Sequence, residues 1–192
     1  MKTTKLSLVV LIAATMLCLP ARAQLGGLGK LMAPVTADSL LGEVNSGMDF
    51  FNKATAKYNE ALAKSGIVLK SASDVKAAVN VTEGDVGSTG QLSTTVKTTA
   101  DGANEMIAKG QEPSEEAKKL ISEGNAEMGK GLAKWAVLTV LITKASKDGA
   151  SDAKLAAAIV SAGMIVKDLP KVKEMYDTMQ KINKIKKQAE AS

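Results

Sequence analysis

The chain has 192 residues, of which 25 are lysine or arginine and 20 are aspartate or glutamate, with no histidine and a single cysteine. Three of the basic residues and none of the acidic ones precede position 24, so removal of residues 1–23 would lower the formal net charge from +5 to +2. A charge so close to neutral excludes the basic surface that nucleic-acid binding requires. The lack of histidine and the early position of Cys18 exclude most catalytic and metal-ligating chemistry from the rest of the chain.

The first 23 residues follow the three-part pattern of a secretory signal peptide. A short basic start, Met1–Lys5, precedes an apolar run at 6–19, and Ala21 and Ala23 supply the small residues that signal peptidase recognises. The run spans roughly 21 Å as a helix, short of the ~30 Å hydrocarbon core of a bilayer. We therefore expect an exported protein, periplasmic or secreted, that is soluble from Gln24 onward and contains no disulfide.

Residues 24–37 combine glycine and proline and are expected to form a flexible N-terminal segment, and residues 38–190 are expected to form a single helical domain. The first helix is predicted to start at Asp38 or Ser39, either of which can cap it, and to end at Gly66. Its apolar residues recur at intervals of three and four, so they share one face: Leu41, Val44, Met48, Phe51, Tyr58 and Leu62.

The stretch 67–90 has no single interpretation. Ser73–Asp74 could cap a short helix, whereas residues 67–69 and 79–81 could be short strands, so helix, strand and loop all stay open. The glycines at its end predict a loop at 84–90. Helical spacing then resumes at Gln91 and continues to Gly110, which predicts the next helix.

A further helix is predicted to start at Pro113–Glu116, where acidic residues suit the positive end of the helix dipole. Its apolar stripe continues to Trp135, but glycines interrupt it at positions 124, 129 and 131. Each glycine costs about 1 kcal/mol relative to alanine inside a helix. Either the helix breaks here or a neighbouring backbone packs closely against it, and close packing is the favoured interpretation.

Two segments, 135–142 and 155–166, are apolar in almost every direction. Between them a basic turn, a stop glycine and the cap Ser151–Asp152 predict a reversal of the chain. Burying one large aliphatic side chain contributes roughly 1.5–3 kcal/mol, so we expect this hairpin, residues 132–166, to lie innermost. A last helix is predicted to begin at Pro170, because proline is tolerated in the first turn of a helix. The sequence thus predicts an all-α bundle of five or six helices around an apolar central hairpin.

Three short motifs point to chemistry but lack the partners that the chemistry needs. Gly124–Lys130 has the spacing of a phosphate-binding loop, yet Gly131 stands where a magnesium-binding serine or threonine is required. The Ser-x-x-Lys sequences at Ser73 and Ser151 have none of the accompanying motifs of serine–lysine hydrolases, and they are typical of helix caps. We therefore expect no enzymatic activity, no cofactor and no metal site.

By elimination, the sequence predicts an exported, non-catalytic protein that acts by binding in the cell envelope or the extracellular space. Its partner would be another protein, a second copy of the chain, or a lipid or membrane surface, and not nucleic acid. The alternative is a carrier of an apolar ligand, or a membrane-perturbing protein, that uses the 132–166 hairpin. The candidate residues for this alternative are large apolar side chains of the hairpin: Trp135, Val137, Leu138, Leu141, Ile159, Val160 and Ile165.

Overall fold

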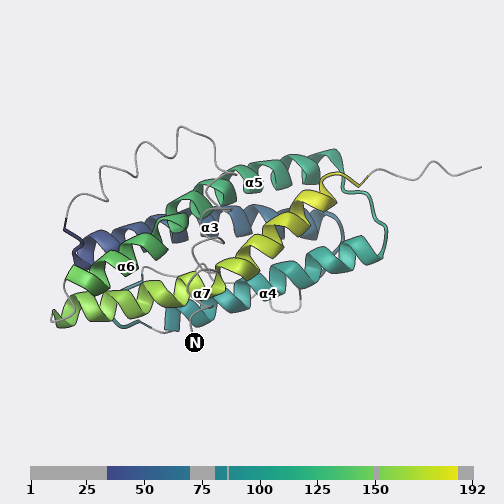
Figure 1. Cartoon of the computed structure of the whole chain (residues 1–192). Helices are drawn as coiled ribbons and strands as arrows, with labels where there is room; N and C mark the ends of the chain where they lie inside the picture. The colour runs from purple at the N-terminus through teal and green to yellow at the C-terminus, as the bar shows by residue number, and fades with distance from the viewer. Residues whose placement is uncertain (1–33, 70–80, 86, 149–151, 186–192) are drawn as a thin grey trace, which may run out of the picture.

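The structure is a computed structural model, and the residues it describes are 34–69, 81–85, 87–148 and 152–185. Within these residues every regular element is a helix, so the predicted all-α fold class is confirmed for the part of the chain described (Figure 1). The predicted signal peptide and most of the segment 24–37 lie outside the described residues, as do residues 70–80, where a short helix after Ser73–Asp74 is one of the alternatives that the sequence leaves open.

The helices, in chain order, are α3 (Ala37–Lys64), α4 (Gly87–Ala108), α5 (Glu115–Ala136), α6 (Leu138–Asp148) and α7 (Ala153–Ile182). Only Val137 separates α5 from α6, so the two segments form one bent rod. When α5 and α6 are counted as one bent helix, the described residues contain four helices, fewer than the five or six expected.

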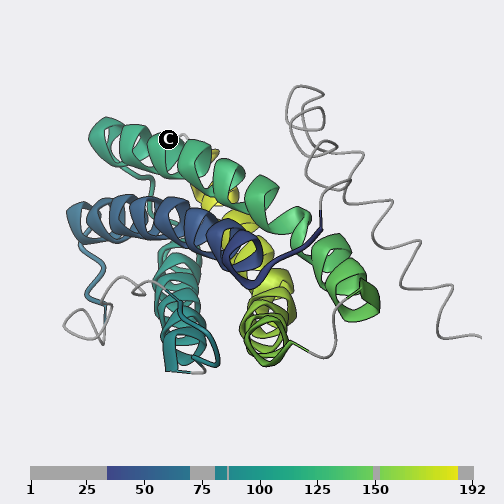
Figure 2. The same cartoon turned by 90° about the vertical axis from the view of Figure 1, so that its left-hand side faces the viewer.

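The helices pack as two crossing pairs. α3 and α5 lie side by side, α4 and α7 form a second pair against them, and α6 lies at the edge of the molecule next to α7 (Figure 2). Both α3 and α7 contact all four other helices. The expectation that the 132–166 hairpin is innermost is therefore wrong for α6, and it is wrong for the outer face of α7, where Val160 is 55% exposed.

The distribution of aromatic residues explains why α3 and α5, rather than the hairpin, form the tightest contact. Aromatic side chains bury more apolar area than any aliphatic one. The three that are completely buried are Phe51 and Tyr58 of α3 and Trp135 of α5. The first half of α7, in contrast, is rich in alanine, which contributes little area to a core.

Close approach of α3 and α5 accounts for the glycines in both helices. A Cβ atom on Gly47 would overlap the indole of Trp135, and one on Gly124 would lie 2.5 Å from Cε1 of Tyr58. A Cβ atom on Gly131 would lie 3.2 Å from the carbonyl oxygen of Gly47. Since α5 is continuous through these positions, the predicted close packing is confirmed at 124 and 131 and the alternative of a helix break is wrong.

Polar contacts also join these two antiparallel helices. The ammonium group of Lys57 lies 2.6 Å from the carboxylate of Glu123, and this hydrogen bond raises the pKa of the lysine. The buried hydroxyl of Tyr58 donates to Oδ1 of Asn125 at 2.8 Å. Burial raises the pKa of this phenol well above its ordinary value, so Tyr58 stays a neutral donor.

The ends of α3 and α4 agree in part with the sequence. Gly66 and Gly110 end the two helices as predicted, each with a positive φ (74° and 58°) that glycine adopts without strain. The start of α3 lies before the expected caps, Asp38 and Ser39. Thr36 caps the helix, because its hydroxyl accepts from the N–H of Ser39 at 3.1 Å and its own N–H donates to the Ser39 hydroxyl at 3.0 Å.

Helix α4 begins at Gly87 rather than at Gln91, so the predicted loop at 84–90 is wrong from position 87 onward. The reason is a cap from Asp85, whose Oδ1 accepts from the N–H groups of Gly87 and Ser88 at 2.8 and 3.1 Å. Its Oδ2 accepts from the Ser88 hydroxyl at 2.5 Å. These hydrogen bonds, that from the Ser88 hydroxyl foremost, hold the pKa of Asp85 below its ordinary value.

The segment just before α4 is neither helix nor strand, and side chains of two helices hold it in place. The amide of Asn45 on α3 donates to the carbonyl of Val81 at 3.0 Å, and its Oδ1 accepts from the Val81 N–H at 2.6 Å. The hydroxyl of Ser161 on α7 donates to the carbonyl of Thr82 at 3.1 Å. Together with the burial of Val81, these bonds bring the start of α4 to α3 and α7.

Helix α7 is one helix of 30 residues with Pro170 inside it, so the separate last helix predicted to begin at this proline is wrong. Asp152 caps α7, as predicted. Proline has no N–H to donate to the carbonyl four residues earlier, and such a position bends a helix. Figure 1 shows the yellow C-terminal half of α7 rising away from the line of its first half.

The glycine contacts predict opposite effects for two neighbouring substitutions. Gly124→Ala should lower the free energy of unfolding by about 1–3 kcal/mol, because the added methyl meets the ring of Tyr58. Gly129→Ala should raise it by up to about 1 kcal/mol, since the nearest atom to its Cβ is the Tyr176 hydroxyl at 4.0 Å. Urea denaturation followed by circular dichroism measures both, and equal effects would contradict the close α3–α5 contact.

The Asp85 cap predicts a pH-dependent stability. Asp85→Ala should lower the free energy of unfolding by about 1 kcal/mol near neutral pH. Because the pKa of Asp85 is depressed in the folded protein, its contribution is present above the unfolded pKa of ~3.9 and is lost as the pH falls through the folded pKa. Denaturation curves of the wild type and the variant should therefore converge in acid. Glu83→Ala, at an exposed position two residues earlier, serves as the control.

Candidate functional site

An open groove of about 450 Å³ lies where the start of α3, the end of α5 and α6 meet. Its apolar wall comes from Pro34, Val35 and Leu141, and the exposed Gly42 leaves part of the α3 backbone uncovered. The volume falls within the ~300–1,000 Å³ that is typical of small-ligand sites. The groove is therefore the first place on the described surface where a binding site can be sought.

One ion pair lies in this groove. Glu43 of α3 is only 7% exposed, and its Oε2 lies 3.8 Å from Nζ of Lys134 on α5. A carboxylate removed from water without a charge partner would cost several kcal/mol, so the lysine stabilises the buried charge. The Lys134 side chain is itself 42% exposed. The groove thus presents a cationic group to solvent beside an apolar wall.

The bend between α5 and α6 forms the groove. Val137 ends α5, and its carbonyl accepts from the N–H of Leu141 at 3.0 Å, which starts α6 in a new direction. Trp135 anchors the bend: its indole N–H donates to the carbonyl of Val44 at 3.0 Å, and its ring centroid lies 5.9 Å from that of Phe51. Trp135 is completely buried, so it supports the groove without lining it.

The structure separates the seven hairpin residues that the sequence singled out. Trp135, Leu138, Leu141 and Ile165 are buried, Val137 and Ile159 are half-buried, and Val160 is exposed. Of the seven, Leu141 is the one that lines the groove. The other six line neither this groove nor a second one between α3 and α5.

The sequence analysis missed Glu43 and Lys134. One signal was present: Glu43 stands on the apolar stripe of α3, three residues after Leu40, and a charged residue on a buried face needs a partner. Nothing in the spacing of the chain identified that partner, because Lys134 lies on a different helix.

A second open groove, of about 620 Å³, lies between α3 and α5 on their outer side. The ring of Phe50 lies between two ammonium groups there, those of Lys53 and Lys130, each 5.7 Å from the ring centroid. Each lysine also forms an ion pair, with Asp49 and Glu127 respectively, at 2.6 Å. In the Lys53–Asp49 pair both side chains are more than half exposed, so this groove presents both charges to solvent. The first groove, in contrast, buries the carboxylate of its ion pair and exposes the lysine.

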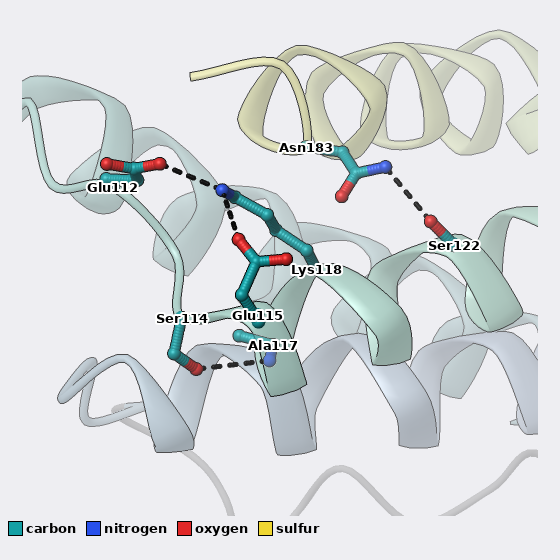
Figure 3. A network of polar contacts seen from close by, with 7 residues as sticks. All are labelled: Glu112, Ser114, Glu115, Ala117, Lys118, Ser122 and Asn183. Carbon is teal, nitrogen blue, oxygen red and sulfur yellow. Dashed lines mark hydrogen bonds and ion pairs between the residues drawn. The ribbon is translucent and has the colours of Figure 1, made fainter. Parts of the chain in front are cut away.

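A polar cluster joins the end of α7 to the start of α5 (Figure 3). The Nζ atom of Lys118 lies 2.8 Å from carboxylate oxygens of both Glu112 and Glu115, and Nδ2 of Asn183 donates to the Ser122 hydroxyl at 3.0 Å. The buried Oδ1 of Asn183 has no hydrogen-bond partner among the described residues. The bond from Asn183 to Ser122 ties the end of α7 to α5. Within the described ranges, no group of three His, Cys, Asp or Glu side chains could hold a metal ion.

No protein-family model, curated protein or solved structure matches this chain. Across the described ranges, no helix combines the length and the apolar character needed to cross a membrane.

Trp135 is expected to be a structural residue. Trp135→Phe should lower the free energy of unfolding by about 1–3 kcal/mol, because it removes the hydrogen bond to Val44 and part of a buried ring. Circular dichroism during urea denaturation measures the change. A variant as stable as the wild type would show that the bend at Val137 does not depend on this anchor.

Proposed function

We propose that this chain is an exported, non-catalytic helical-bundle protein that acts by binding in the cell envelope or the extracellular space. The signal-peptide pattern of residues 1–23 supports export. The lack of histidine, and of cysteine after position 23, supports a role without catalysis. The observation that carries the binding role is the groove between α3, α5 and α6, in which an apolar wall adjoins the Glu43–Lys134 ion pair.

The chemistry of the groove favours an amphipathic occupant. The apolar part would lie against Val35 and Leu141, where it gains about 25 cal/mol for each Å² removed from water. An anionic group would approach Lys134, whose ammonium group is accessible from solvent. A segment of a partner protein with an acidic residue beside aliphatic ones supplies this chemistry, and a protein partner is the leading proposal.

A carrier of a small apolar ligand is the second candidate, and the volume of the same groove favours it. The two candidates differ in the molecule expected to accompany the protein when it is isolated from its native source. Mass spectrometry of the protein from its native source would detect a co-purified lipid for a carrier. A photoreactive residue at position 42 would form a crosslink to another polypeptide for a protein partner.

Filling the groove should weaken binding of a probe without harming the fold. Gly42 lines the groove, and a Cβ atom there meets no atom within 4 Å, so Gly42→Leu places a side chain in the groove without a clash. The probe is 8-anilinonaphthalene-1-sulfonate, which joins aromatic rings to one anionic group. We expect its affinity to fall at least about tenfold, which corresponds to ~1.4 kcal/mol.

Gly90→Leu on α4 is the matched control, because its Cβ also meets no atom within 4 Å and it lies away from the groove. Both variants should keep the helical circular dichroism of the wild type. Unchanged dye affinity in Gly42→Leu would overturn the groove as the binding site. If the protein hydrolysed a substrate and a single carboxylate substitution abolished that activity, the proposed non-catalytic role would be wrong.

A further inference from the structure

The first half of α7 carries an apolar face that faces solvent. Val160 is 55% exposed, and it is one of the large hydrophobic residues most exposed among those described. Ala153 and Ala156 are also exposed, and a Cβ atom on Gly163 would meet no atom within 4 Å. These four residues recur at intervals of three and four, so they form one continuous stripe on the outside of the helix.

Exposed lysines lie near both ends of this stripe. Lys154 follows Ala153 at the start of α7, Lys167 lies one turn after Gly163, and Lys147 is the next-to-last residue of α6. None of the three forms an ion pair with a described residue. Every lysine of α3 and α4, in contrast, lies within 2.8 Å of a carboxylate oxygen. These three ammonium groups can therefore interact with an external partner.

The acidic residues of the hairpin do not cancel this charge. Residues 138–167 contain four lysines, at positions 144, 147, 154 and 167, and two aspartates, Asp148 and Asp152, so their formal net charge is +2. Of these lysines, Lys144 already has an interaction partner. The carboxylate of Asp152 already accepts from the backbone N–H groups at the start of α7, the nearer of them at 2.9 Å. The exposed stripe therefore belongs to a hairpin whose formal charge is positive.

We propose that this hairpin face, the stripe of Ala153, Ala156, Val160 and Gly163 with its flanking lysines, docks on the surface of an anionic phospholipid bilayer. An apolar stripe beside accessible lysines matches the boundary between acyl chains and negatively charged headgroups. A second copy of the chain is a poorer match, because two such faces would bring lysines together. A protein partner is also a poorer match, since the stripe has no aromatic or arginine anchor.

Vesicle co-sedimentation tests the proposal with the full mature chain. The protein should bind vesicles of phosphatidylcholine containing about one-third phosphatidylglycerol and should not bind vesicles of phosphatidylcholine alone. Raising the salt concentration to ~1 M shortens the Debye length to about 3 Å, so binding should be lost. Equal binding to the two kinds of vesicle, or no binding to the anionic ones at low salt, would overturn the proposal.

Val160→Asp tests the stripe, and we expect it to weaken binding at least about tenfold, because a carboxylate opposes both the apolar and the anionic part of the surface. Val68→Asp is the matched control: Val68 is 82% exposed and lies in the non-helical stretch after α3. If the two substitutions weaken binding equally, the stripe is not the contact. A third outcome is that the wild type forms dimers, the Val160→Asp variant is a monomer, and neither protein binds vesicles. In that case the face is a self-association surface and the proposal fails.

The lysines are tested separately. Lys147→Gln and Lys154→Gln should each weaken binding about fivefold, the contribution expected of one basic residue near an anionic surface. Lys181→Gln is the control, because this exposed lysine lies at the other end of α7. Since the stripe and the groove at Gly42 lie on different helices, Gly42→Leu should leave vesicle binding unchanged, and failure of one proposal does not imply failure of the other.

Discussion

The ring of Trp135 lies where the side chain of residue 47 would stand, and only glycine at that position allows it. The same relation holds between Tyr58 and Gly124. Because two helices packed at this distance cannot slide past each other without overlap, these contacts fix the register of α3 and α5. That register brings Lys134 to Glu43 at one end of the pair, and it places the bend that leads into α6 over the start of α3. The groove is a consequence of the helix contact.

Features of the fold that depend on short-range interactions could be predicted from the sequence. Apolar spacing of three and four identified α3, α4 and α5, and Gly66 and Gly110 mark helix ends because their backbone angles are local properties. The predictions that failed concern packing. Pro170 favours a helix start locally, yet α7 continues through it, since the residues on both sides lie against other helices. Which helix lies innermost also depends on how much area each one buries, which spacing alone does not give.

The candidate sites show the same limit. Glu43 and Lys134 meet across two helices, and no spacing in one chain relates residues so far apart. For Val160 the difficulty is different. Segment 155–166 is apolar on nearly every side, so no polar residue marks the face that remains outside. The sequence identified the hairpin as unusually apolar. The structure was needed to show that Leu141 lines the groove, whereas Val160 is exposed to solvent.

The hydrogen bond between Ser161 and Thr82 also has a consequence for the order in which the chain folds. The two residues are 79 positions apart, and the chain is made from its N-terminus. While α7 is still being synthesised, Asn45 can already bind the segment before α4, and α4 can already lie against α3, but the face of α4 that later contacts α7 has no such contact. Assembly of this half of the molecule is therefore completed when the last helix docks on α4.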